Sequence, residues 1–129
     1  MRALLILFAG VLVGALVAFS AANALYQRNA WPRGVMNVLQ HHFGELRRLQ
    51  RRSDCAPAKT ALHFQRLAQT GADIGPAFAD EKPDFHDQAR RFVDTSSRLG
   101  ADAPPGCQAL DQALQQASDA CESCHLRYR

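Results

Sequence analysis

The distribution of apolar residues divides the chain into two parts. The stretch from Ala3 to Ala22 is almost entirely apolar, and no charged residue follows Arg2 until Arg28. Beyond about residue 25, apolar residues recur at intervals of three and four, which is typical of amphipathic helices. No segment alternates apolar and polar residues as a half-buried strand would. The sequence therefore predicts an N-terminal apolar helix followed by an all-α domain over residues 25–129.

Glycine and proline divide this domain into four helical segments, because proline suits the first turn of a helix and glycine suits its end. We expect helices over residues 32–52, 58–70, 83–100 and 107–128, with a loop over residues 71–82. Four amphipathic helices with short connections favour an antiparallel up-down-up-down four-helix bundle.

The apolar stripe of each helix predicts which residues face the core of the bundle. In the first helix Met36 and Phe43 lie on a stripe beside the main one. The expected core residues are Val35, Val38, Leu39, His42, Leu46, Leu49, Ala61, Leu62, Phe64, Leu67, Ala68, Phe85, Ala89, Phe92, Val93, Ser96, Leu99, Leu110, Ala113, Leu114, Ala117, Ala120, Cys121 and Cys124.

The N-terminal apolar segment has two interpretations. Residues 1–24 have the basic start, the apolar body and the small-residue site Ala22-Asn23-Ala24 of a cleaved secretory signal. Residues 3–22 are also long enough for a helix that crosses about 30 Å of hydrocarbon and stays as a membrane anchor. Under both interpretations, residues 25–129 are exported. We therefore expect the domain in the periplasm, either soluble or tethered to the inner membrane.

Composition and charge argue against two classes of function, nucleic-acid binding and catalysis. The chain has 15 Lys and Arg against 12 Asp and Glu, so its balance does not predict nucleic-acid binding, which needs a dense basic patch. Four arginines gather in RRLQRR, residues 47–52, and form either a solvated helix face or a docking patch for an acidic redox partner. No Ser-His-Asp set, carboxylate pair or phosphate-binding loop is present, and we do not expect an enzyme.

We expect the four cysteines of an exported domain to be used, because oxidising compartments favour disulfides. Cys121 and Cys124 belong to a motif at the end of the chain, which leaves Cys55 and Cys107 as a natural pair. In an up-down-up-down bundle these two lie in loops at the same end, so a disulfide between them is geometrically reasonable. The alternative is a pair of free, half-buried thiols.

The C-x-x-C-H motif formed by Cys121, Cys124 and His125 is the attachment signal of a c-type haem. Two thiols on one helical turn reach two neighbouring vinyl groups of the porphyrin and form thioethers, and the next histidine becomes the proximal iron ligand. A thioredoxin-like pair normally opens a helix after a strand, and a zinc site usually needs a second ligand pair. A plain disulfide between Cys121 and Cys124 would not explain why a histidine follows them.

The motif and its position resemble the class II c-type cytochromes, the cytochrome c-prime family, which end in C-x-x-C-H-x-x-[YF]-R. Here the ending is CESCHLRYR, and the stretch RGVMNVLQHHFGEL, residues 33–46, is similar to the first helix of that family. Matching the pair His42 and Phe43 places the distal axial position on Met36. The resemblance implies one covalent haem c, held by Cys121 and Cys124 and ligated by His125 and Met36.

The residue at the sixth position of the iron decides between two functions that the resemblance implies. A methionine gives a six-coordinate, low-spin haem suited to single-electron transfer with redox partner proteins. If Met36 only packs the core, the site is open to NO or CO and the protein is a gas-binding haem protein. A second copy of the chain, in a homodimer, is a further partner that the sequence leaves open.

The other histidines of the domain are not expected to ligate the iron. They are His41, His42, His63 and His86. We expect a separate group of aromatic, apolar and basic side chains near the haem, where they would exclude water and neutralise its propionates: Arg33, Ile74, Phe78, Tyr128 and Arg129.

Overall fold

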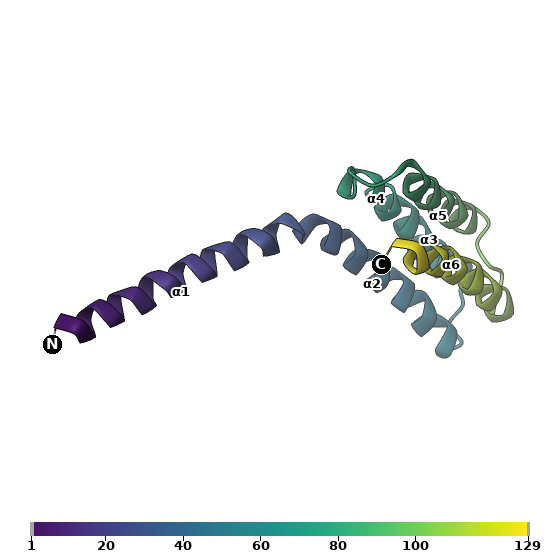
Figure 1. Ribbon diagram of the computed structural model, residues 1–129. Helices are drawn as coiled ribbons and strands as arrows, with labels where there is room; N and C mark the ends of the chain where they lie inside the picture. Colours follow the sequence, from purple (N-terminus) through teal and green to yellow (C-terminus); the bar gives the residue numbers. More distant parts are fainter. Residues whose placement is uncertain (1, 129) are drawn as a thin grey trace. The chain divides into compact units, whose positions relative to one another are not determined.

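The structure, a computed structural model, describes residues 2–128, with the side chains of Leu5 and Arg28 left aside. Across this range every regular element is a helix and there is no strand, which confirms the predicted all-α class (Figure 1). The helices are α1 (Arg2–Arg28), α2 (Ala30–Arg51), α3 (Pro57–Gly71), α4 (Ile74–Ala77), α5 (Pro83–Ala101) and α6 (Cys107–Tyr128).

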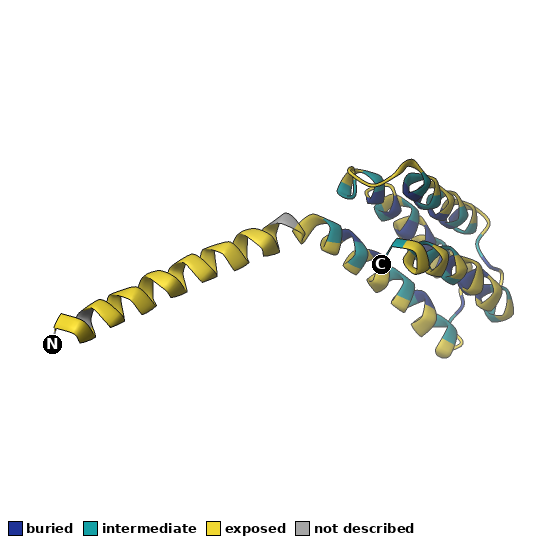
Figure 2. Cartoon of the chain, viewed as in Figure 1, coloured by how far each residue is buried: buried dark blue, intermediate teal, exposed yellow. Residues whose placement is uncertain are grey.

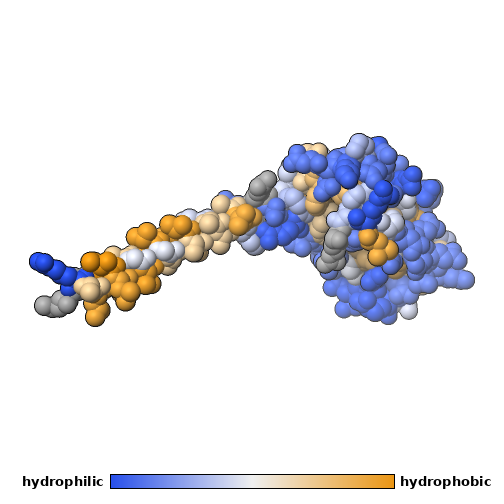
Figure 3. All heavy atoms as spheres, viewed as in Figure 1, coloured by the Kyte–Doolittle hydropathy of each residue, from blue (hydrophilic) through white to orange (hydrophobic). Residues whose placement is uncertain are grey.

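The chain separates into two compact units, Met1–Arg33 and Gly34–Arg129. The first unit consists mainly of α1, whose apolar side chains are exposed along its length (Figure 3). The segment Arg2–Gln27 contains an 18-residue stretch with a mean hydropathy of 2.6 and is long and apolar enough to cross a membrane. A signal sequence near an N-terminus has the same properties, so both interpretations of this segment remain.

The second unit has one apolar core, lined by a stripe from each of its long helices (Figure 2). Leu46, Phe64, Leu67 and Leu110 are its largest fully enclosed apolar side chains. The predicted stripe of α5 is buried or half-buried throughout, and that of α6 is buried as far as Ala117 and half-buried beyond it.

Two predicted core positions are wrong. Val38 of α2 is 43% exposed, and Leu62 of α3 is 49% exposed. Thr60, which was not expected in the core, is fully buried, and its hydroxyl donates a hydrogen bond to the Pro57 carbonyl. A helical stripe is about 100° wide, so whether a residue at its edge is buried depends on where the neighbouring helices lie.

The closest packing in the second unit joins α3 to α5, and small residues permit it. A Cβ on Gly71 of α3 would lie 2.9 Å from Cε1 of Phe92 in α5. A Cβ on Gly100 of α5 would lie 2.9 Å from Cγ and 3.1 Å from the backbone nitrogen of Gln65 in α3. Both glycines were expected only as helix ends, yet each also sits where two helices touch.

The expected loop over residues 71–82 contains the short helix α4, which the sequence analysis missed. Its Ile74 is buried, and Phe78, four residues later, packs against Phe85 with ring centroids 5.4 Å apart. Two apolar side chains at that spacing lie on one face of a helical turn, and burying them against α5 stabilises a turn too short to persist alone.

Cys55 and Cys107 form a disulfide with their Cα atoms 5.2 Å apart, which confirms the predicted pair. The bond links the segment just after α2 to the first residue of α6. Alongside it, Arg51 of α2 and Asp111 of α6 line one groove. The last turns of α2 therefore lie beside the first turns of α6, and the two helices extend away from the disulfide.

Candidate functional site

The C-x-x-C-H motif occupies the final turns of α6 and continues the buried stripe of that helix. Cys121 and Cys124 are half-buried and pack against the core, whereas His125 is exposed. Residues separated by three and four positions share a helix face. The three side chains therefore lie on one face, which begins in the core at Cys121 and reaches solvent at His125.

Both thiols of the motif are free, and their surroundings keep them protonated. Burial raises the pKa of the Cys121 thiol, the neighbouring Cys124 raises it further, and the positive charge of Arg47 opposes the rise. Burial also raises the pKa of Cys124. Dithiol oxidoreductases depend on a lowered thiol pKa, so the environment of this pair does not favour thiol–disulfide chemistry.

Met36 of α2 packs against the same core as the two thiols and is half-buried. It lies 15 residues before the end of α2 at Arg51, and His125 lies 18 residues after the start of α6 at Cys107. At about 1.5 Å per residue these separations are about 22 and 27 Å from the disulfide-linked ends of the two helices. The structure thus places Met36 and His125 at similar heights along neighbouring helices.

The middle of α2 supplies an aromatic and a basic side chain on the side of α6. The Arg47 guanidinium carbon lies 4.6 Å from the centroid of the Phe43 ring, a cation–π contact, and the Arg47 charge acts on Cys121. Phe43 is half-buried against the core. An apolar ring and a cation therefore border the motif.

The end of α6 is fastened to the start of α5. The Tyr128 ring packs edge-on against Phe85 with centroids 5.2 Å apart, and an Arg127 guanidinium nitrogen lies 2.7 Å from a carboxylate oxygen of Asp84. The buried Tyr128 hydroxyl approaches the same carboxylate, although the contact falls short of regular hydrogen-bond geometry. These contacts fix the turn that carries the motif.

Only some of the side chains expected around the haem are found near the motif. Ile74, Phe78 and Tyr128 gather near this end of α6, because Phe85 contacts both Phe78 and Tyr128 and α4 packs on α5. Arg129 lies outside the described residues. Arg33 belongs to the N-terminal unit, where it donates hydrogen bonds to the carbonyl oxygens of Tyr26 and Asn29.

Within residues 2–128, no group of three or more His, Cys, Asp and Glu side chains is assembled to hold a bare metal ion. Cys121, Cys124 and His125 fit a haem, because a porphyrin supplies four of the iron ligands itself and needs from the chain two thiols, one imidazole and apolar cover. The half-buried Met36, Phe43 and Tyr128 can provide that cover.

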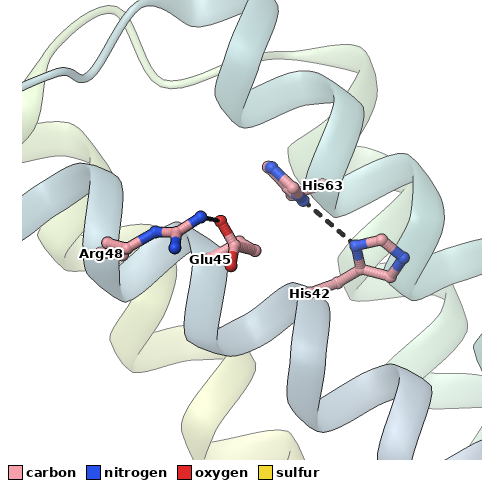
Figure 4. A network of polar contacts seen from close by, with 4 residues as sticks. All are labelled: His42, Glu45, Arg48 and His63. Carbon is pink, nitrogen blue, oxygen red and sulfur yellow. Dashed lines mark hydrogen bonds and ion pairs between the residues drawn. The ribbon is translucent and has the colours of Figure 1, made fainter.

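A second arrangement of side chains, absent from the sequence-based expectations, joins α2 to α3. The Nδ1 atoms of His42 and His63 lie 3.1 Å apart, and one donates a hydrogen bond to the other (Figure 4). Glu45 lies one turn after His42 and forms an ion pair with Arg48. The sequence holds no local signal for this pair, because His42 and His63 are brought together only when α2 packs on α3.

Comparison of the chain with protein-family models, with curated proteins and with solved structures found no match.

Proposed function

We propose that this protein is an exported mono-haem c-type cytochrome that carries single electrons. The observation that carries the proposal is the C-x-x-C-H motif on the last turns of α6, with two free, half-buried thiols and an exposed histidine on one helix face. Cys121 and Cys124 would hold the porphyrin through thioethers, and His125 would ligate its iron.

The residues around the motif suit the binding of a large apolar ring. Raised pKa values keep both sulfurs as thiols, the form that adds across a vinyl group with its own hydrogen. Phe43, Phe85 and Tyr128 supply aromatic surface that excludes water, and Arg47 offers a cation for a propionate. When bound, the haem supplies an iron centre that accepts and releases one electron.

Met36 is the proposed sixth ligand. Its thioether is a soft donor, it lies on α2 at a height similar to that of His125, and it is half-buried. Two protein ligands, one from α2 and one from α6, would clamp the iron between helices and keep it low-spin in both oxidation states. Such a centre changes little on electron transfer, which suits a carrier rather than an enzyme.

The four long helices of the second unit support a four-helix bundle of the cytochrome c-prime type as the finer fold. The disulfide holds one end of α2 to the start of α6, and Asp84 and Arg127 hold the other end of α6 to α5. These two links lie at opposite ends of α6, as expected for an antiparallel bundle with the haem motif at one end.

The compartment follows from the same features. A disulfide and a thioether-bound haem both belong to an exported domain, and α1 can serve either as a cleaved signal or as an anchor in the inner membrane. The proposed location is the periplasm, with soluble or membrane-bound redox proteins as partners.

An absorption spectrum and an intact mass of the natively exported protein test the proposal. We expect a Soret band and a mass that exceeds the polypeptide by one haem, with both lost in a Cys121→Ala, Cys124→Ala double variant. A low-spin ferric spectrum that CO does not perturb after reduction supports electron transfer. A high-spin spectrum that shifts with CO would instead support gas binding, and a colourless protein of polypeptide mass would refute the haem altogether.

A further inference from the structure

The pair formed by His42 and His63 lies away from the motif residues and has a geometry of its own. The two rings come from different helices, α2 and α3, and their Nδ1 atoms face each other at 3.1 Å (Figure 4). Both side chains are half-buried. A single proton between the two nitrogens gives each of them a hydrogen-bond partner, because one ring donates and the other accepts.

The separation of the two nitrogens also suits a metal ion. With metal–nitrogen bonds of about 2.0–2.1 Å, nitrogens 3.1 Å apart subtend an angle of about 100° at the ion, between the octahedral and tetrahedral values. The ion would take the place of the hydrogen bond after each ring rotates, and the proton of the donor ring would move from Nδ1 to Nε2, so that both Nδ1 lone pairs bind the ion. Imidazole is a preferred ligand of Zn²⁺, Cu²⁺ and Ni²⁺.

Glu45 is the candidate for a third donor. It lies three residues after His42, so the two side chains share a face of α2. Its side chain is only 18% exposed and is now paired with Arg48. Its negative charge raises the pKa of both His42 and His63. Two imidazoles and a carboxylate are a common ligand set for divalent transition metals.

We propose that His42, His63 and Glu45 form a binding site for a divalent transition-metal ion between α2 and α3. In the metal-free state two interactions occupy the ligand atoms. The imidazoles are hydrogen-bonded to each other, and the Glu45 carboxylate is paired with Arg48. These interactions agree with the absence, among residues 2–128, of a preassembled group of three ligands. The site uses none of the proposed haem ligands.

The surroundings keep the histidines in the form that binds metals. Burial is the main cause of the lowered pKa of His42, and the charges of His63, His41 and Arg66 add to it. Burial also lowers the pKa of His63, together with His41 and Arg48. Glu45 opposes the shift of both rings. At neutral pH the two imidazoles are therefore neutral, and each can offer an Nδ1 lone pair to a metal once the shared proton has moved to Nε2.

The test is a titration of the full chain with Zn²⁺ in detergent solution, in competition with a chromophoric chelator. Any free thiols are first alkylated, so that Cys121 and Cys124 cannot contribute. We expect one ion per chain, loss of that ion in His42→Ala and in His63→Ala, and affinity weakened by about tenfold or more in Glu45→Gln. Arg48→Gln should bind more tightly than the wild type, because the competitor for Glu45 is gone.

Two controls make the result specific. His86→Ala removes a ring that contacts the Glu81 carbonyl, and His41→Ala removes the exposed neighbour of His42, so both should bind as the wild type does. With Cu²⁺ in place of Zn²⁺, electron paramagnetic resonance of the unmutated chain should report two nitrogen ligands, which needs no variant to fold. Failure to bind Zn²⁺, equal binding by His63→Ala, or a copper spectrum without nitrogen ligands would overturn the site. Each outcome is independent of whether the chain carries haem.

Discussion

Arg127, in the last turn of α6, pairs at 2.7 Å with Asp84, in the first turn of α5. The pair is half-exposed, yet it acts with the packing of Tyr128 on Phe85. Together these contacts fasten the last turn of the helix that carries Cys121, Cys124 and His125. Helix ends fray unless other contacts hold them, so this clamp gives the motif a fixed position.

Replacing Asp84 should loosen this clamp in a pH-dependent way. The approach of the Tyr128 hydroxyl is the main cause that lowers the pKa of Asp84 from its ordinary value of 3.8, and Arg127 lowers it further. A carboxyl with a lowered pKa stabilises the fold above its ordinary value, and this stabilisation is lost as the pH falls through the lowered value.

Urea unfolding should therefore find Asp84→Asn less stable than the wild type at pH 7, and the difference should shrink as the pH falls through the lowered pKa. Asp87→Asn is the matched control, because Asp87 pairs with Arg90 within α5 and holds no second helix. Equal losses in the two variants at pH 7 would contradict the role of the clamp.

Met36→Ala should change the spin state of the proposed haem without removing it. Loss of the thioether leaves the iron with His125 alone, so the ferric absorption spectrum should change from low-spin to high-spin while the haem content stays the same. Val38→Ala, at a 43% exposed position of the same helix, should leave the spectrum unchanged. A low-spin spectrum in Met36→Ala would remove this residue from the site.

Removing the disulfide should lower the free energy of unfolding. Cys55 and Cys107 are 52 positions apart, and a crosslink that closes such a loop is worth about 4 kcal/mol in the chain-entropy model. A Cys55→Ser, Cys107→Ser double variant should show this loss in chemical unfolding. Since the disulfide lies at the far end of α6 from the motif, haem attachment should persist. A loss below about 1 kcal/mol would argue against a constrained loop.

Two glycine substitutions separate close packing from helix propensity. Gly71→Ala forces a methyl group to within 2.9 Å of Phe92 and 3.1 Å of Val93, so it should destabilise the protein by about 1–3 kcal/mol. Gly44→Ala meets nothing within 4 Å and should stabilise α2 by about 0.5–1 kcal/mol. Thermal unfolding of both variants measures the contrast, and effects of the same sign would disprove it.

The imidazole pair should make stability fall in mild acid. The pKa values of His42 and His63 in the folded protein lie below their ordinary value of 6.5, mainly because the rings are buried. The unfolded chain therefore takes up protons first as the pH falls through 6.5, and the free energy of unfolding decreases. In the absence of metal ions, a His42→Gln, His63→Gln double variant should lose this decrease between pH 7.5 and 5.5. An unchanged pH profile would show that other groups control it.

Much of the fold could be predicted because helical periodicity is a local property of the sequence. The stripe of Phe85, Ala89 and Phe92 in α5 was recognised, as was that of Leu110, Ala113 and Leu114 in α6. The prolines at residues 57 and 83 and the glycine at residue 71 placed the ends of α3 and α5 to within a residue. Val38 and Leu62 were misplaced, because the edge of a stripe is defined by a neighbouring helix.

Recognising the C-x-x-C-H motif needed no tertiary information, because the motif lies in five consecutive residues. Finding the contacts around it did need the tertiary structure. Asp84 lies 43 residues from Arg127 and was not foreseen as its partner. Arg33 was expected near the haem, yet its hydrogen bonds go to carbonyl oxygens in the preceding turns of its own unit. A long polar side chain bonds to whichever partner lies within reach, and the packing of the helices determines which groups those are.

The sequence by itself predicted the helices, because helical periodicity and helix-end signals act within a few turns. It also predicted the pairing of Cys55 with Cys107, since the other two cysteines belong to the C-x-x-C-H motif, and it is the basis of the proposals that the domain is exported and carries haem on Cys121, Cys124 and His125. Only the tertiary structure decided that His42 meets His63, that Arg127 reaches Asp84 and that Gly71 lies against Phe92. Such contacts join residues more than twenty positions apart, and they exist only after the helices have packed.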